Sequence, residues 1–364
     1  MLGSVGILAK FWAKVNDCKG VHIPLDARFD LQYNLAIFMN RRFWVVLIIV
    51  AAILGGCIGW CIRYASTINH AAAQTTQVRI NSPEYEFINP LLFSDNAKSS
   101  SAYMNNLDAA VSSVISVTEK DPSINSASVY FRDLNSAQWT GVDEDALYKP
   151  SSMLKTLAMM AAFKMAEQDP AILSEKLFFH KALAGGTYYE GDKTMTEGYY
   201  TLSKLIDVMI QSSDNDAFLA IISDQKINDE FVKTYNLLQL PPAGLTGNAD
   251  FMSPKSYAVL FRTLYNSTFF SWNISEQALD LLSKTTFDNG LVAGVPSGMK
   301  VAHKFGENTN QLHDCGIVYY PEHPYLLCIM TKGQDLSKLE SLIAAISKTV
   351  YGYVNSTPLP QKVG

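Results

Sequence analysis

The pattern of apolar and polar positions divides the chain into three parts. Residues 43–62, "FWVVLIIVAAILGGCIGWCI", form an uncharged run of 20 residues, which is long enough to cross a bilayer as a helix. Residues 63–100 are polar and irregular apart from a small apolar group, "FINPLLF". From residue 101 onward, apolar residues recur at helical or strand spacing. We therefore expect a transmembrane helix at 43–62, a stalk at 63–100, a folded domain at 101–355 and a short tail at 356–364.

Within the folded part, the period of the pattern distinguishes strands from helices. Strand-like runs occur near both ends of the domain, and residues 169–290 between them look like helical pieces and loops. The predicted strands are 126–134, 137–142, 299–305, 315–320 and 325–331, and the predicted flanking helices are 102–120 and 336–354. This order indicates an α/β protein of the α+β type: an antiparallel sheet built from both chain ends, flanked by helices, with an inserted all-helical lobe.

The distribution of basic residues predicts the orientation in the membrane. Six lysines and arginines precede the uncharged run, whereas Arg63 and Arg79 are the only two between that run and Lys98. The positive-inside rule then places residues 1–42 in the cytoplasm and the domain outside. We expect a single-pass protein of the cell membrane. A cleaved signal peptide and a lipoprotein box ending at Cys57 are the weaker alternatives.

Composition excludes some classes of partner and leaves others open. The net charge of −5 is weakly acidic, which gives no reason to expect nucleic acid as a partner. The six histidines are scattered without metal-ligand spacing, so we expect no metal and no cofactor. Cys315 and Cys328 lie on two neighbouring predicted strands, where they form either a disulfide or two small buried hydrophobes. The oligomeric state is not indicated.

Candidate chemistry begins in "KPSSMLKTLAMMAAF", where a helix is predicted after Pro150. Ser152 and Lys155 are three residues apart and share one helix face. A serine hydroxyl needs a base to become a nucleophile, and a lysine whose pKa is lowered can be that base. Alone, the pattern favours a capped helix with a solvated lysine. Ser151 is a rival nucleophile or the helix cap.

Two further polar clusters follow along the chain. Ser213, Asp214 and Asn215 interrupt an apolar helical pattern, and an identical tripeptide at 94–96 lies in the stalk, outside any such pattern. In "VAHKFGE", Lys304 ends a predicted strand and is followed closely by a glycine. A cation at a strand edge beside a glycine suits an anionic acyl substrate.

The order Ser-x-x-Lys, Ser-Asp-Asn, Lys-x-Gly resembles the penicillin-recognising serine enzymes, in particular the class A beta-lactamase and D-Ala-D-Ala peptidase-like family. The resemblance covers about residues 101–352, including "RDLNSAQWTGVDEDALYKPSS" and "HDCGIVY". It implies a beta-lactamase/transpeptidase-like fold with the site between the sheet and the helical lobe. The implied substrate is a beta-lactam or a peptidoglycan peptide.

The resemblance also implies roles for individual residues. Ser152 resembles the acylated nucleophile and Lys155 its base. Ser213 is similar to the proton relay to the leaving nitrogen, and Asn215 to the residue that orients the lysine and binds the substrate amide. Lys304 resembles the residue that supplies a positive field. Asp214, by the same resemblance, holds the loop.

The implied substrate-binding residues include one clear departure. Phe305 stands where the family usually has a threonine or serine whose hydroxyl binds the substrate carboxylate, and Thr309 is the candidate substitute. Gly306 permits close approach, and the backbone N–H groups of Ser152 and Glu307 correspond to the oxyanion hole.

A second departure concerns deacylation. Class A beta-lactamases carry a glutamate on the loop before the segment that begins at Ser253, but here the loop-like part, "LPPAGLTGNADF", contains none. Asp250 is its only carboxylate. Without a base to activate water, we expect an acyl-enzyme that persists. The alternatives are a true beta-lactamase with an unrecognised deacylating group and a non-catalytic wall-binding or sensor domain.

Overall fold

The computed structural model describes residues 77–79, 83–94, 101–181, 194–242 and 249–356. The chain divides into two compact units, 1–71 and 72–364, and all described residues belong to the second. The expected cytoplasmic segment and the expected membrane helix at 43–62 lie outside the described residues. Among the helices that are described, none has the length and apolarity needed to cross a bilayer.

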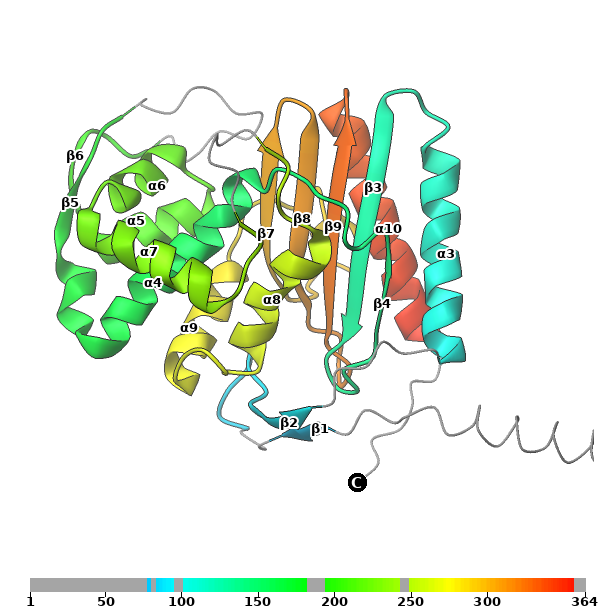
Figure 1. Ribbon diagram of the computed structural model, residues 1–364, viewed down its shortest axis with the longest axis horizontal. Helices are drawn as coiled ribbons and strands as arrows, with labels where there is room; N and C mark the ends of the chain where they lie inside the picture. Colours follow the sequence, from blue (N-terminus) through cyan, green and yellow to red (C-terminus); the bar gives the residue numbers. More distant parts are fainter. Residues whose placement is uncertain (1–76, 80–82, 95–100, 182–193, 243–248, 357–364) are drawn as a thin grey trace, which may run out of the picture. The chain divides into compact units, whose positions relative to one another are not determined.

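A five-stranded antiparallel sheet forms the centre of the described unit (Figure 1). The strand order is β4-β3-β9-β8-β7, so both ends of the domain contribute strands, as predicted. The strands are β3 (Ile124–Asp133), β4 (Trp139–Val142), β7 (Val301–Asn308), β8 (Gln311–Val318) and β9 (Tyr325–Gly333). Because β7 is an edge strand, one of its sides is open to other parts of the fold.

Two helices cover one face of this sheet: α3 (Ala102–Thr118) and α10 (Leu336–Ser356) (Figure 1). Helix α3 buries Met104, Leu107, Val111 and Ile115, a spacing that places all four on one side. They join one hydrophobic core with alternate residues of the strands, among them Val301 and Phe305 of β7.

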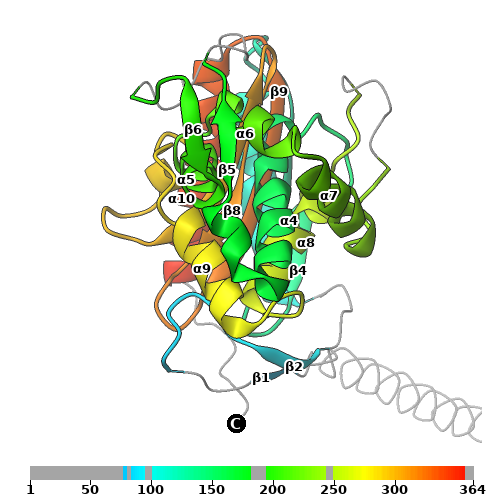
Figure 2. The ribbon, with the colours of Figure 1, turned by 90° about the vertical axis from the view of Figure 1, so that its left-hand side faces the viewer.

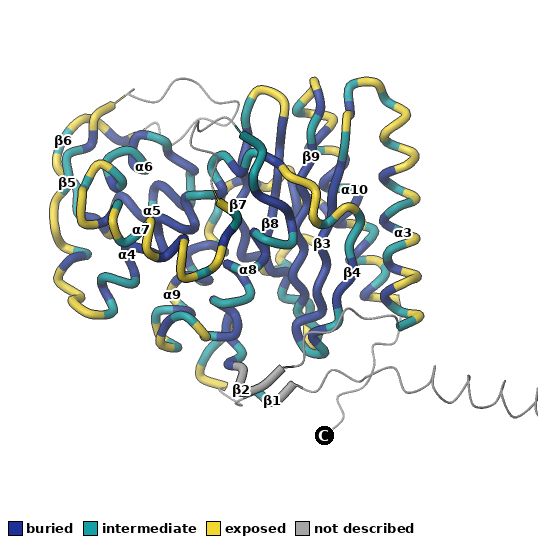
Figure 3. The backbone as a smooth tube through the Cα atoms, in the orientation of Figure 1, coloured by how far each residue is buried: buried dark blue, intermediate teal, exposed yellow. Residues whose placement is uncertain are grey.

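The opposite face of the sheet carries the helical lobe (Figure 2). Its helices are α4 (Leu154–Gln168), α5 (Leu202–Gln211), α6 (Asn215–Ile222), α7 (Gln225–Leu237), α8 (Pro254–Tyr265) and α9 (Trp272–Leu282), with short 3₁₀ turns η1 (Ser151–Met153), η2 (Pro170–Ser174) and η3 (Val292–Gly294). Helix α4 is buried along most of its length (Figure 3), so it is the central helix of the lobe. The predicted antiparallel sheet with flanking helices and a helical lobe is confirmed.

Two features differ from the predicted pattern. Strands β5 (Lys176–Phe179) and β6 (Gly198–Thr201) form a small antiparallel pair in a region that we expected to be helices and loops. They are short and half-exposed, so no long apolar alternation marks them. Strands β1 (Gln77–Arg79) and β2 (Leu91–Ser94) pair within the expected stalk.

Part of the expected stalk packs onto the domain. Phe87 and Ile88 are buried in the larger core, and the carboxylate of Glu276 accepts hydrogen bonds from the backbone N–H groups of Glu86, Phe87 and Ile88 at 2.7–3.1 Å. Tyr319 adds a hydrogen bond to the Phe87 carbonyl. Phe87 and Ile88 of this apolar group are therefore an integral part of the packed structure.

The two cysteines of the sheet form a disulfide. Cys315 of β8 and Cys328 of β9 face each other in register, and both are fully buried. Of the two alternatives open from the sequence, the structure contains the disulfide. Cys315 also pairs in register with Lys304 of β7, so the crosslink lies directly behind that lysine in the sheet.

Candidate active site

The candidate nucleophile stands at a tight turn into the central helix. The chain passes from Pro150 through the 3₁₀ turn of Ser151–Met153 into α4. Ser151 has a φ of 50°, a left-handed conformation that is uncommon for a residue with a side chain. Ser152 is half-buried, so its hydroxyl is reachable. Ser151 is not a side-chain cap of the helix.

Lys155 connects the first two predicted clusters. Its Nζ lies 2.8 Å from Ser152 Oγ, 2.6 Å from the Ser213 carbonyl oxygen and 2.6 Å from Asn215 Oδ1. The two carbonyl-type oxygens can only accept hydrogen bonds. A neutral amine therefore donates its two N–H groups to them and turns its lone pair toward the Ser152 hydroxyl. This arrangement favours Ser152 over Ser151 as the nucleophile.

Lys304 brings in the third cluster. Its Nζ donates to Ser213 Oγ at 2.8 Å and to the Phe305 carbonyl at 3.1 Å, and Ser213 Oγ also lies 3.2 Å from Lys155 Nζ. Ser213 has a φ of 54° between α5 and α6, and Asp214 caps α6 by accepting from the Ala217 N–H at 2.8 Å. The Ser213 hydroxyl, which lies between two amines, can accept from Lys304 and still donate its own proton.

Burial sets the proton affinity of both amines. Desolvation lowers the pKa of Lys155 to about 7, while the carboxylates of Asp214 and Glu307 oppose that shift. Burial, and then the nearby charge of Lys155, hold the pKa of Lys304 well below its usual range. An amine that is neutral near pH 7 is able to act as a general base.

Gly306 allows β7 to pass against the nucleophile turn. A Cβ at this position would lie 2.4 Å from the Pro150 carbonyl oxygen and 2.7 Å from Met153 Cγ. The close packing places Glu307, which is buried, next to the start of α4. The predicted glycine role, permitting close approach, therefore has a direct structural reason.

Two of the predicted substrate-binding side chains lie elsewhere. Phe305 is 1% exposed and stacks on Phe287 with ring centroids 4.3 Å apart, so its ring belongs to the core on the α10 side. Thr309 is exposed in the turn between β7 and β8. Three strand residues, about 10 Å, separate Phe305 from Asn308, where β7 ends. Thr309 therefore cannot replace the hydroxyl that is absent at position 305.

Sequence reasoning missed the residues that hold the nucleophile turn in place. His313 Nε2 bonds the Lys149 carbonyl at 3.0 Å, Gln311 accepts from the Lys149 N–H at 2.9 Å, and Asn308 donates to Ser151 Oγ at 3.2 Å. Complete burial lowers the pKa of His313 to about 4, so the ring is neutral. The signal available in the sequence was the polar character of these positions within two otherwise apolar strands.

The carboxylate nearest in sequence to the expected deacylation loop is already engaged. Asp250 Oδ1 accepts from Gln311 at 2.8 Å, and its Oδ2 lies 3.1 Å from Lys332 Nζ. Both contacts lower the pKa of Asp250 against the opposing effect of burial. A carboxylate held by an amide and a lysine is a poor base for activating water.

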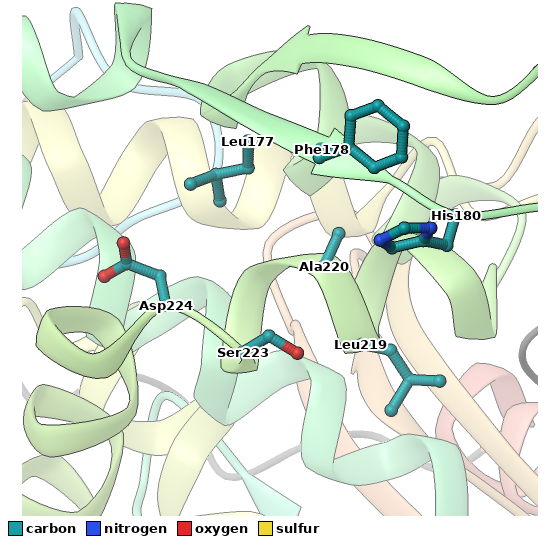
Figure 4. A pocket seen from close by; sticks show the side chains of 7 residues that line it. All are labelled: Leu177, Phe178, His180, Leu219, Ala220, Ser223 and Asp224. Carbon is teal, nitrogen blue, oxygen red and sulfur yellow. The ribbon is translucent and has the colours of Figure 1, made fainter.

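A pocket between β5 and α6 is separate from these clusters (Figure 4). Its lining includes none of the predicted site residues; it consists of Leu177, Phe178, His180, Leu219, Ala220, Ser223 and Asp224. Within the described ranges, His, Cys, Asp and Glu side chains form no group of three that could hold a metal.

The fold and the clustered residues define a class of protein. A serine at a helix start, a buried lysine of lowered pKa one turn away, and a second serine between two amines are groups that can carry out acyl transfer through a serine. The chain is a serine hydrolase of the penicillin-recognising type, as the sequence predicted.

The comparisons identify the family. A family model described as "Beta-lactamase enzyme family" matches residues 106–354, and the chain belongs to that family. No curated protein matches the chain.

Solved structures share the fold. A structure of PBP-A is 22% identical with a TM-score of 0.59, covering 68% of this chain and 97% of that one. A PBP-A variant, described as an acyl-enzyme complex with penicillin G, is 23% identical with a TM-score of 0.60, covering 70% and 98%. A class A beta-lactamase from Mycobacterium abscessus is 20% identical with a TM-score of 0.59, covering 68% and 100%. The roles of the individual site residues stay predictions.

Proposed function

We propose that this chain is a membrane-anchored, extracytoplasmic serine hydrolase that is acylated at Ser152 by beta-lactams or by D-Ala-D-Ala-type peptidoglycan peptides. The observation that carries the proposal is the position of Lys155 Nζ, 2.8 Å from Ser152 Oγ with carbonyl-type acceptors on its other sides. This geometry provides a base for the serine without a histidine.

Acylation follows from the proton positions. Lys155 Nζ takes the proton of the Ser152 hydroxyl while Oγ attacks the substrate carbonyl carbon. The backbone N–H groups of Ser152 and Glu307 would stabilise the oxyanion. As the C–N bond breaks, the Ser213 hydroxyl gives its proton to the leaving nitrogen and regains one from the amines beside it. Asn215 holds Lys155 and would bind the substrate amide.

Slow deacylation is the second part of the proposal. It is supported by the engagement of Asp250 with Gln311 and Lys332, which leaves this carboxylate poorly placed to activate water. A PBP-A variant of this fold is described as an acyl-enzyme complex with penicillin G. The class A beta-lactamases of the same fold make rapid beta-lactam hydrolysis the competing function.

The proposed location rests on the uncharged run and on the disulfide. Residues 43–62 would anchor the chain with its N-terminus in the cytoplasm. The Cys315–Cys328 disulfide is consistent with an oxidising compartment outside the cell membrane. In spheroplasts, added protease should remove the domain and spare a tag at residue 1; protection of the domain would refute the orientation.

A fluorescent penicillin tests the acylation. We expect a stable covalent label on the wild-type protein, no label on Ser152→Ala, and an unchanged label on the matched control Ser113→Ala, at an exposed serine of α3. Intact mass should rise by the mass of the whole penicillin, because the opened ring stays attached. Labelling that survives Ser152→Ala would mean another nucleophile. Rapid steady turnover of nitrocefin would support the competing beta-lactamase function, and no label on the folded wild type would indicate a non-catalytic binding domain.

A further inference from the structure

The Nζ group of Lys304 makes its hydrogen bonds within the protein. It donates to Ser213 Oγ and to the Phe305 carbonyl, and the Phe305 ring centroid lies 4.1 Å from Nζ. A lysine has three N–H groups, and an aromatic face is a good neighbour for the third. Because Lys304 is fully buried, it cannot reach a substrate without breaking these contacts.

The ring beside this lysine is firmly held. Phe305 stacks on Phe287 at an interplanar angle of 21° and is packed in the α10-side core. A phenyl ring has no donor for a carboxylate. The position that carries a hydroxyl in the family therefore offers no hydrogen-bond donor, and its ring is held in the core by a partner from the loop after α9.

The next side chain on the same face of β7 is acidic. Residues 305 and 307 are two apart on a strand, so Phe305 and Glu307 project to the same side. The charge of Glu307 acts on both Lys155 and Lys304, raising the pKa of each. The buried charge of Glu307, which acts on both amines, would disfavour a second carboxylate beside Lys304.

The arginines of the folded domain do not replace Lys304 as a binding group for a substrate carboxylate. After residue 79, the sequence contains only Arg132 and Arg262. Arg132 is on β3, and Arg262 of α8 bonds Tyr130 of the same strand. Strands β9 and β8 separate β3 from β7, a distance of about 14 Å. Among the described residues, the structure therefore places no guanidinium beside Lys304 to bind an anion.

We propose that the Lys304 corner, formed by Lys304, Phe305 and Glu307, selects acyl donors that carry an uncharged group, an amide or an ester, where the family binds a free carboxylate. This inference rests on the proposed acylation of Ser152 and narrows its substrate class. Lys304 then serves mainly to support Ser213, and the corner offers a free carboxylate neither a hydroxyl donor at position 305 nor an exposed cation.

Penicillin G and its methyl ester test the inference, because they differ only in the charge of this group. The measured quantity is the second-order rate constant for acylation of Ser152, followed by intact mass. A site that binds the carboxylate by charge-assisted hydrogen bonds should favour the acid by about tenfold to a hundredfold. We expect the acid to have no such advantage. An acid that reacts more than tenfold faster than the ester would overturn the inference while leaving the proposed function intact.

Two variants test the assigned residues. Phe305→Thr and, separately, Glu307→Gln should each raise the acid-to-ester ratio by about tenfold, the first by adding a donor and the second by removing repulsion. The ratio cancels effects on the chemical step that both substrates share. Glu307→Gln keeps the shape of the side chain, so it remains informative if the core variant at 305 does not fold. Ratios that stay at the wild-type value in every folded variant would also overturn the inference. If neither compound acylates Ser152, the proposed function fails first.

Discussion

The rate of Ser152 acylation should follow the neutral fraction of Lys155. With the pKa of this lysine lowered by burial to about 7, the amine is about 10% neutral at pH 6, half neutral at pH 7 and about 90% neutral at pH 8. The rate should therefore rise about fivefold from pH 6 to 7, about twofold from 7 to 8, and then level off. At the usual value of 10.5, only about 0.03% would be neutral at pH 7.

Asp214→Asn is the perturbation that tests this cause. Asp214 is the first of the two carboxylates that raise the pKa of Lys155, so removing its charge should lower that pKa and move the rising limb of the profile to lower pH. Asparagine caps a helix about as well as aspartate, so the contact with Ala217 that begins α6 should persist.

The assay measures the rate of acylation by penicillin G methyl ester between pH 5.5 and 9.5. The charge of this ester does not change over that pH range. Asp145→Asn is the matched control, because Asp145 is 70% exposed and pairs with Lys255 on the surface. We expect its profile to superimpose on that of the wild type. A rate that keeps rising tenfold per pH unit up to pH 10 would show that Lys155 keeps its usual pKa. A profile that is flat from pH 5.5 would show that another group is the base.

The remaining predictions concern the support of the site. His313→Ala removes the hydrogen bond to the Lys149 carbonyl, just before the nucleophile turn. It should lower the unfolding free energy by about 2–3 kcal/mol in chemical denaturation and slow the acylation of Ser152. The control His180→Ala, at an exposed histidine, should change neither quantity. Glu276→Ala should cost about 3 kcal/mol and Glu276→Gln less, because the amide keeps one acceptor for the docked 86–88 segment. Lys155→Met should abolish acylation. The pKa of Lys155 is lower in the folded state than its unfolded value of 10.5, so above pH 7 the unfolded chain binds more protons than the folded one. The difference in unfolding free energy between the wild type and Lys155→Met should therefore grow by about 3 kcal/mol from pH 6 to 9, in favour of the wild type. A difference that does not depend on pH would contradict this.

The sequence predicted the main strands, the main helices and the clustering of the site residues, because these depend on long periodic segments and on the order of the motifs. The sheet strands near both chain ends and the helices α3, α4 and α10 have apolar faces that only one arrangement buries. The three polar clusters meet because the fold brings together the start of α4, the break between α5 and α6, and strand β7. The pair β5–β6 escaped prediction because its strands are four residues long and half-exposed, so tertiary packing decides their conformation.

The surroundings of the site could not be predicted in the same way. Phe305 is covered by Phe287, which lies 18 positions earlier in a loop. The role of His313 depends on a carbonyl at Lys149, far away in sequence. Both are contacts of single side chains across the fold, and neither produces a period or a motif. A strand motif gives the order of its residues, whereas neighbouring elements determine what each side chain contacts.

The same burial that prepares Lys155 as a base also weakens Lys304 as an anion site. Two amines that share Ser213 Oγ disfavour each other's charged form, so the cluster is better suited to moving a proton than to holding a carboxylate. The strand cannot move outward to expose Lys304 alone, because Gly306 packs directly against Pro150 at the nucleophile turn. Any shift of β7 that uncovered the cation would also displace Ser152. Selectivity for an uncharged group is therefore coupled to the geometry that activates the nucleophile.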